Sequence, residues 1–219
     1  MPNKSYFPFL SFAFLYLIFT LFQWEILTSW FKPFLIPLLA FVLIKTATFE
    51  VKKALWFALL FSWFGDVLLL FVTKNSLFFI LGLVSFLLAH LAYIYLFLKL
   101  QPQKSNPFNR YLVLIVLYLF SFLYLLWDSL HEMKIPVIVY ALVISIMLYV
   151  VIQLHLSTKQ KATRILVWGA IFFVLSDSIL AINKFYTPIN WSSFWIMSTY
   201  LTAQFLLVYG ILAQKKDAS

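Results

Sequence analysis

The chain has 219 residues, of which 64% are hydrophobic and only 11% are charged, and its formal net charge at pH 7 is +9. This polar content is too low to cover the surface of a globular protein in water, which excludes a soluble enzyme or a soluble binding domain. The sequence contains no cysteine, so disulfides and thiol catalysis are also excluded. We therefore expect an all-α, polytopic integral membrane protein.

Eight apolar tracts approach or exceed the roughly 20 residues that a helix needs to cross a bilayer. In chain order they cover residues 7–25, 31–49, 54–73, 76–98, 109–127, 134–154, 165–183 and 191–213. Because the connections are short, we expect a single membrane domain over 1–219, with the longest connection, 101–107, as a linker between halves. No small-residue cleavage site follows the first tract, so we expect it to remain as a helix rather than act as a signal peptide.

The basic residues predict the orientation of these helices. Eight spans put both termini and the even-numbered loops on one side of the membrane. That side holds twelve of the sixteen basic residues: Lys4, Lys45, Lys52, Lys53, Lys99, Lys104, Arg110, Lys159, Lys161, Arg164, Lys215 and Lys216. Because Lys and Arg concentrate in cytoplasmic loops, we predict cytoplasmic termini in a bacterial-type inner membrane. The net charge then faces anionic lipid, and we expect no nucleic-acid partner.

Two acidic residues, Asp66 and Asp177, lie inside apolar tracts rather than at their ends. Each follows a cytoplasmic-side cation, Lys53 or Arg164, by thirteen residues, so both lie about 20 Å from that end, in the outer half of the membrane. An ionisable side chain in a membrane costs ~2.5–3.5 kcal/mol even on a lenient scale, so two at one depth indicate a function. The alternative is a pair of hydrogen-bonded acids that only pack helices, which Ser or Asn would do at lower cost.

The segments that end in the two acids, 58–66 and 169–177, are similar to one another. A lysine and a proline also open both the second tract, at Lys32 and Pro33, and the sixth. These similarities favour two four-helix halves repeated in parallel about an axis along the membrane normal. Such a repeat would bring the two carboxyls face to face. Burial and mutual repulsion would then leave one protonated and one ionised at neutral pH.

Other polar side chains recur at helical spacing inside the tracts, which predicts that they share inward faces with the acids. The supporting residues that we expect in the site are Ser62, His90, Tyr93, Tyr140, Ser176, Asn183, Tyr200 and Gln204. Taken singly, each is also explained as a hydrogen-bonded packing residue.

Of three histidines only His90 is inside a tract, which disfavours a three-histidine zinc site, although a mixed Asp/His/Asp site stays open. No phosphate-binding loop or nucleophile elbow is present. We expect no metal and no cofactor.

Two segments carry a resemblance to a known family: 61–69, with Ser62, Gly65 and Asp66, and 173–185, with the run Ser176, Asp177 and Ser178. The matching positions elsewhere are Lys32, Pro33, Gly82, His90, Tyr93, Pro136, Tyr140, Asn183, Tyr200 and Gln204. This pattern resembles the YhhN, or lysoplasmalogenase, family over nearly the whole chain.

The resemblance implies an eight-helix membrane hydrolase that cleaves the vinyl ether bond of lysoplasmalogens. The products would be a fatty aldehyde and glycerophosphoethanolamine or glycerophosphocholine, and the lysophospholipid or ether-lipid substrate would come from the bilayer. We expect Asp66 and Asp177 to be catalytic, as in glycosidases: one donates a proton, and the other, ionised, stabilises the oxocarbenium ion and activates water. Lys32 is expected to reach the lipid phosphate from the external end.

The residues alone leave two other functions open. A proton-coupled small-molecule or lipid transporter would use the same intramembrane acids as proton carriers, and its parallel repeat would provide alternating access. A structural membrane scaffold would use them only for packing. Flux of unmodified substrate would indicate the transporter, and tolerance of Asp→Asn changes would indicate the scaffold.

Overall fold

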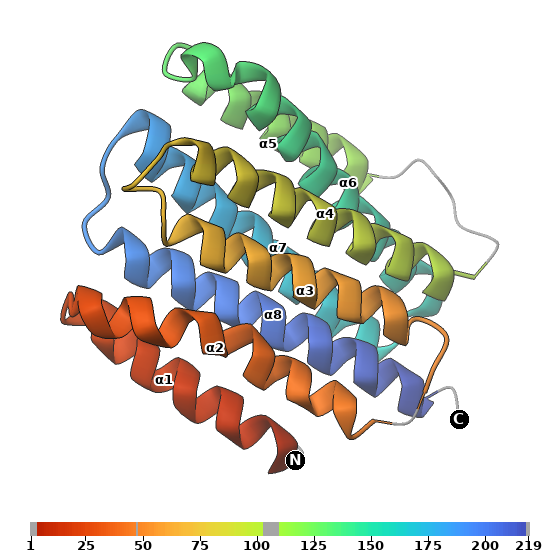
Figure 1. Ribbon diagram of the computed structural model, residues 1–219. Helices are drawn as coiled ribbons and strands as arrows, with labels where there is room; N and C mark the ends of the chain where they lie inside the picture. The colour runs from red at the N-terminus through yellow and green to blue at the C-terminus, as the bar shows by residue number, and fades with distance from the viewer. Residues whose placement is uncertain (1–3, 47, 103–109, 218–219) are drawn as a thin grey trace. The chain divides into compact units, whose positions relative to one another are not determined.

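The computed structural model describes residues 4–46, 48–102 and 110–217. Within these ranges all regular secondary structure is helical and includes eight α-helices (Figure 1). They are α1 (Phe7–Leu21), α2 (Glu25–Ile44), α3 (Lys52–Leu69), α4 (Leu77–Leu100), α5 (Arg110–Leu126), α6 (Lys134–Thr158), α7 (Lys161–Ala181) and α8 (Ser192–Asp217). The all-α fold class is confirmed, and each predicted tract corresponds to one helix.

Five of the described helical segments are long and apolar enough to cross a membrane: Glu25–Ile44, Leu77–Leu100, His131–Thr158, Lys161–Tyr186 and Ser192–Gln214. Two further apolar helices, α1 and α5, are shorter. The remaining helix, α3, has 18 residues and includes three charged ones, Lys52, Lys53 and Asp66. Large apolar side chains such as Trp30, which is 72% exposed, cover the outside of the helices. The protein is therefore a polytopic membrane protein, with lipid as the solvent of these side chains.

The chain forms two compact units, Met1–Tyr93 and Ile94–Ser219. In the first unit α2 packs against both α1 and α3, and in the second α7 packs against both α6 and α8, while α5 packs against α6. Short connections explain why helices that follow one another in sequence are neighbours in each unit. The division falls inside α4, whereas the predicted linker at 101–107 extends beyond the described residues.

The predicted boundary between the first two helices is wrong by several residues. α1 ends at Leu21 and α2 begins at Glu25, where the prediction had 25 and 31. The turn between them contains Gln23, whose φ of 57° is in the left-handed region that commonly ends helices. Glu25 then begins α2, where its carboxylate interacts favourably with the positive end of the helix dipole. Lys32 consequently lies seven residues into α2, about 10 Å from its start.

Glycines allow the helices that carry the two acids to pack closely. In the first unit a Cβ added to Gly65 on α3 would lie 2.6 Å from the ring of Phe86 on α4. A Cβ on Gly82 of α4 would lie 2.9 Å from the side chain of Leu69 on α3. Each glycine therefore receives a large side chain from the other helix.

The second unit repeats this arrangement between α7 and α8. A Cβ on Gly169 would lie 2.9 Å from Leu207, and one on Gly210 would lie 2.6 Å from Leu166. These contacts fix the rotation of α7 and so the direction in which its polar residues point.

Candidate functional site

Asp66 forms an ion pair with Lys32 in the first unit. It occupies the last turn of α3, and its side chain is 2% exposed. The Nζ atom of Lys32, on α2, lies 3.9 Å from the Oδ1 atom of Asp66. A neighbouring ammonium group favours the ionised carboxylate, and the carboxylate in turn favours the ammonium form. Breaking a buried pair of this kind is costly, so these two residues stabilise one another's position.

The position of Lys32 differs from the expectation that its side chain reaches a lipid phosphate at the external end. Because α2 begins at Glu25, Lys32 is two helical turns below the start of the helix. Its ammonium group lies at the level of Asp66 instead.

A tryptophan on α3 holds this helix against α2 at the level of the ion pair. Pro37 has no N–H, so the carbonyl of Pro33, four residues earlier in α2, lacks its usual helical donor. The Nε1–H group of Trp63 donates a hydrogen bond to this carbonyl at 2.7 Å. Backbone groups in a membrane must find partners within the protein. The two prolines and Trp63 therefore position Lys32 and Asp66.

The polar residues of α3 and α4 that were predicted to share inward faces with the acids are buried in the first unit. Ser62, His90 and Tyr93 are each 0% exposed. The Nδ1–H group of His90 donates to the backbone carbonyl of Phe86 at 2.6 Å, which fixes the proton on that nitrogen because a carbonyl can only accept. Ser85, one residue before Phe86, donates to the carbonyl of Phe61 on α3 at 2.7 Å. The bond from Ser85 ties α4 to the helix that carries Asp66.

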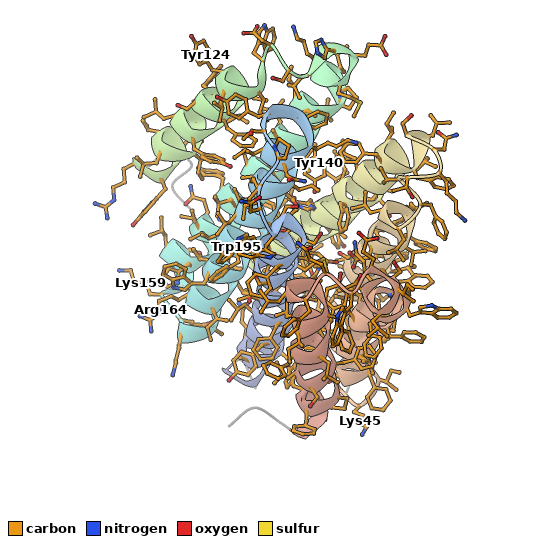
Figure 2. The ribbon with its side chains drawn as sticks, turned by 90° about the vertical axis from the view of Figure 1, so that its left-hand side faces the viewer. Lys45, Tyr124, Tyr140, Lys159, Arg164 and Trp195 are labelled. Atoms are coloured by element: carbon orange, nitrogen blue, oxygen red, sulfur yellow. The ribbon has the colours of Figure 1, made fainter. Side chains whose placement is uncertain are left out.

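Asp177 lies in the second unit and is held by a tyrosine. It is four residues before the end of α7, and the hydroxyl of Tyr140, on α6, donates to its Oδ2 atom at 2.6 Å. Tyr140 lies between the end of the unit marked by Tyr124 and the end marked by Lys159 and Arg164 (Figure 2).

A small cavity of about 40 Å³ lies beside this carboxyl, and Ser145 is among its lining residues. One water needs roughly 10–15 Å³ of such volume and at least two polar partners. The cavity is therefore large enough to hold water next to Asp177.

A second tyrosine closes the side of this cavity toward α5. Tyr118, on α5, forms a hydrogen bond with Ser178, the residue after Asp177. Ser178 already donates its single proton to the carbonyl of Val174, so the Tyr118 hydroxyl is the donor to Ser178. Tyr118 and Ser178 both line the cavity that contains Asp177.

The remaining predicted residues of this unit lie along α7 and α8. Ser176, 1% exposed, donates to the carbonyl of Ile196 on α8 at 3.0 Å. Tyr200, which is 3% exposed, packs edge-on against Phe173. Gln204, one turn further along α8, is 0% exposed. The contacts of Ser176 and Phe173 attach α7 to α8 in the turn that precedes Asp177.

Asn183 has a local role in the connection after α7. Its Oδ1 atom accepts the backbone N–H of Ile189 at 2.9 Å, which stabilises the turn that leads to α8. Asn183 does not line the cavity of Asp177, so its hydrogen bond serves the loop before α8.

The structure brings Lys32 to Asp66 in one unit and Tyr140 to Asp177 in the other. Sequence reasoning missed Trp63, Tyr118 and Ser178 as parts of these surroundings. Tyr118 carried a signal, because a phenol in the middle of an apolar tract needs a hydrogen-bond partner as much as an acid does. In the part of the chain that the structure describes, no three His, Asp or Glu side chains gather as a metal site.

A family model described as the YhhN family matches residues 27–211. This range contains both acids and all of their partners described above. The chain belongs to the YhhN family. The match confirms the resemblance seen in the segments around Asp66 and Asp177.

Several curated relatives support this membership. The lysoplasmalogenase TMEM86B of Homo sapiens is 31% identical over 192 residues, which cover 84% of this chain and 76% of the human protein. A lysoplasmalogenase of Mycobacterium tuberculosis is 30% identical over 191 residues, which cover 82% of this chain and 68% of that protein. The human lysoplasmalogenase TMEM86A is 42% identical over 48 residues, or 22% of this chain and 20% of its own. No solved structure matches.

Proposed function

We propose that this YhhN-family protein is a membrane ether hydrolase that cleaves the vinyl ether bond of lysoplasmalogens. The products are a fatty aldehyde and glycerophosphoethanolamine or glycerophosphocholine. The observation that carries the proposal is that each intramembrane acid, Asp66 and Asp177, is held by a polar side chain from the preceding helix. The lysoplasmalogenases among its relatives support the same reaction.

The chemistry of a vinyl ether requires a proton donor first. Transfer of a proton to the β-carbon of the double bond converts the ether into an oxocarbenium ion. Water adds to the α-carbon of this cation and loses a proton, and the resulting hemiacetal breaks its bond to the glycerol oxygen. A positioned carboxylic acid typically accelerates such a proton transfer by about 10²–10⁴-fold. A second, ionised carboxylate stabilises the cation, as in glycosidases.

The surroundings of the two acids favour different roles. Asp66 is the ionised partner that stabilises the cation, because Lys32 lies beside it. Asp177 is the proton donor. Once it has given up its proton, its carboxylate accepts a proton from water in the adjacent cavity, which restores the acid for the next cycle. Tyr140 fixes the carboxyl of Asp177 in both steps through its hydrogen bond.

The experiment that tests this function uses the purified protein and a lysoplasmalogen in deuterium oxide. Mass spectrometry should detect a fatty aldehyde with one deuterium on the carbon next to the aldehyde group, together with the glycerophospho alcohol. A saturated lyso-alkyl-ether lipid is the matched control, because it has no double bond to protonate and should remain intact. Absence of aldehyde together with flux of unmodified lipid into proteoliposomes would overturn the hydrolase and support a transporter.

A further inference from the structure

A lipid-facing groove runs between α5, α6 and α7 in the second unit. Its volume is about 390 Å³. Aliphatic side chains form most of its wall: Leu114 and Ile115 from α5, Leu148 and Ile152 from α6, and Ile171 and Leu175 from α7. Leu114 and Leu175 are 59% and 45% exposed, so the groove is open along its side. A ligand can enter it from the bilayer without passing through water.

The groove adjoins the small cavity of Asp177. Tyr118, Val174 and Ser178 line both. The hydrogen bond between Tyr118 and Ser178 therefore lies where the aliphatic groove meets the cavity that contains the carboxyl of Asp177. An aliphatic groove that leads to a carboxyl suits a molecule with one long hydrocarbon chain and a reactive bond at the end of that chain.

The direction of the groove follows from its positions on the helices. On α7 its residues begin at Ile171, six residues before Asp177, or about 9 Å along the helix. On α6 they extend to Ile152, which is twelve residues or about 18 Å beyond Tyr140. Both lead toward the end of the unit that carries Lys159 and Arg164 (Figure 2). If that end is cytoplasmic, as the basic residues predict, the groove runs from the level of Asp177 toward the cytoplasmic side of the membrane.

We propose that this groove binds the hydrocarbon chain of a single-chain ether lipid, with the vinyl ether at Asp177 and the methyl end near Ile152. The inference rests on the proposed function and deepens it by assigning the binding site of the chain. A volume of about 390 Å³ is near the lower end of ligand pockets, roughly 300–1,000 Å³, which suits one chain rather than two. A lipid whose headgroup lies at the external end would direct its chain along this groove.

A substitution that fills the groove tests the proposal. Leu148→Trp should raise KM for long-chain lysoplasmalogens by about tenfold, because an indole occupies the space of several methylenes, and should change KM for short-chain ones much less. Ile146→Trp is the matched control, since this residue of the same helix is 48% exposed and lines neither cavity. An identical dependence on chain length in both variants and the wild type would overturn the proposal.

A second measurement on the wild-type protein needs neither turnover nor a variant. A saturated lyso-alkyl-ether lipid with a photoreactive diazirine at the end of its chain cannot be hydrolysed. After irradiation, its label should map to groove residues such as Leu114, Ile152 and Ile171. Labelling confined to other surfaces would overturn the groove even if aldehyde release is observed. Labelling in the groove without aldehyde release from a lysoplasmalogen would contradict the hydrolase alone.

Discussion

At the scale of single residues, each acid is defined by its partner rather than by its depth alone. Asp66 and Asp177 could be identified from the sequence because carboxyls are rare inside apolar tracts. Their partners could not, because contacts between helices depend on helix rotation and on where each helix begins. Lys32 illustrates this point: its expected place at a lipid phosphate changed once α2 began at Glu25.

The ion pair predicts a particular pattern of stability. Lys32→Met should lower the free energy of unfolding of the detergent-purified protein by about 3–5 kcal/mol, because it leaves the carboxylate of Asp66 buried without its cation. The double variant Lys32→Met, Asp66→Asn should regain most of this stability. Thermal unfolding of the wild type, both single variants and the double variant gives the coupling. Additive losses would argue against an ionised pair.

The hydrogen bond from Tyr140 predicts a kinetic effect. Tyr140→Phe should reduce kcat for lysoplasmalogen hydrolysis about tenfold, because this hydrogen bond orients the proposed acid and a bond between neutral groups is worth roughly 0.5–1.5 kcal/mol. Tyr124→Phe is a suitable control, because Tyr124 is 87% exposed and lies at the end of α5. Equal rates for the two variants would remove Tyr140 from the mechanism.

At the scale of helices, apolar length predicted all eight elements, because only helices satisfy their own backbone in lipid. The turn between α1 and α2 was missed because Gln23 adopts a left-handed conformation that glycine or asparagine more often marks. The bond between Trp63 and Pro33 could not be foreseen either. A proline shows which carbonyl loses its donor, but not which side chain replaces it.

The contact between α2 and α3 gives a test of that replacement. Trp63→Phe should destabilise the protein by about 1–3 kcal/mol, because the carbonyl of Pro33 loses its donor inside the membrane. In a Pro37→Ala background the restored N–H of residue 37 can bond to this carbonyl, so Trp63→Phe should cost much less. Thermal unfolding of the four proteins measures the difference, and an unchanged cost would assign the effect of Trp63 to packing.

At the scale of the whole molecule, the two units share a pattern that the sequence indicated only weakly. In each half the acid lies on the third helix and contacts a polar side chain from the second: α3 and α2 in one half, α7 and α6 in the other. The partners differ in chemistry, an ammonium in one and a phenol in the other. This difference in chemistry favours unequal roles for the two acids in the proposed reaction.

The distribution of basic residues predicts the orientation of the molecule. Both termini should be cytoplasmic, because the cations gather at the termini and at the loops after even-numbered helices. A fluorescent protein fused to the C-terminus should be bright in a bacterial host, and alkaline phosphatase at the same position should be inactive. The opposite pair of results would reverse the orientation and place the groove between α5, α6 and α7 toward the other leaflet.

The most direct test of the two-acid mechanism measures aldehyde release by the wild type, Asp66→Asn and Asp177→Asn with a lysoplasmalogen substrate. Both substitutions should lower kcat by about 10²-fold or more, because each removes a carboxyl that the proposed reaction requires. Gel filtration and thermal unfolding in the same detergent establish that each variant is folded. Full activity in either folded variant would contradict the mechanism based on two acids.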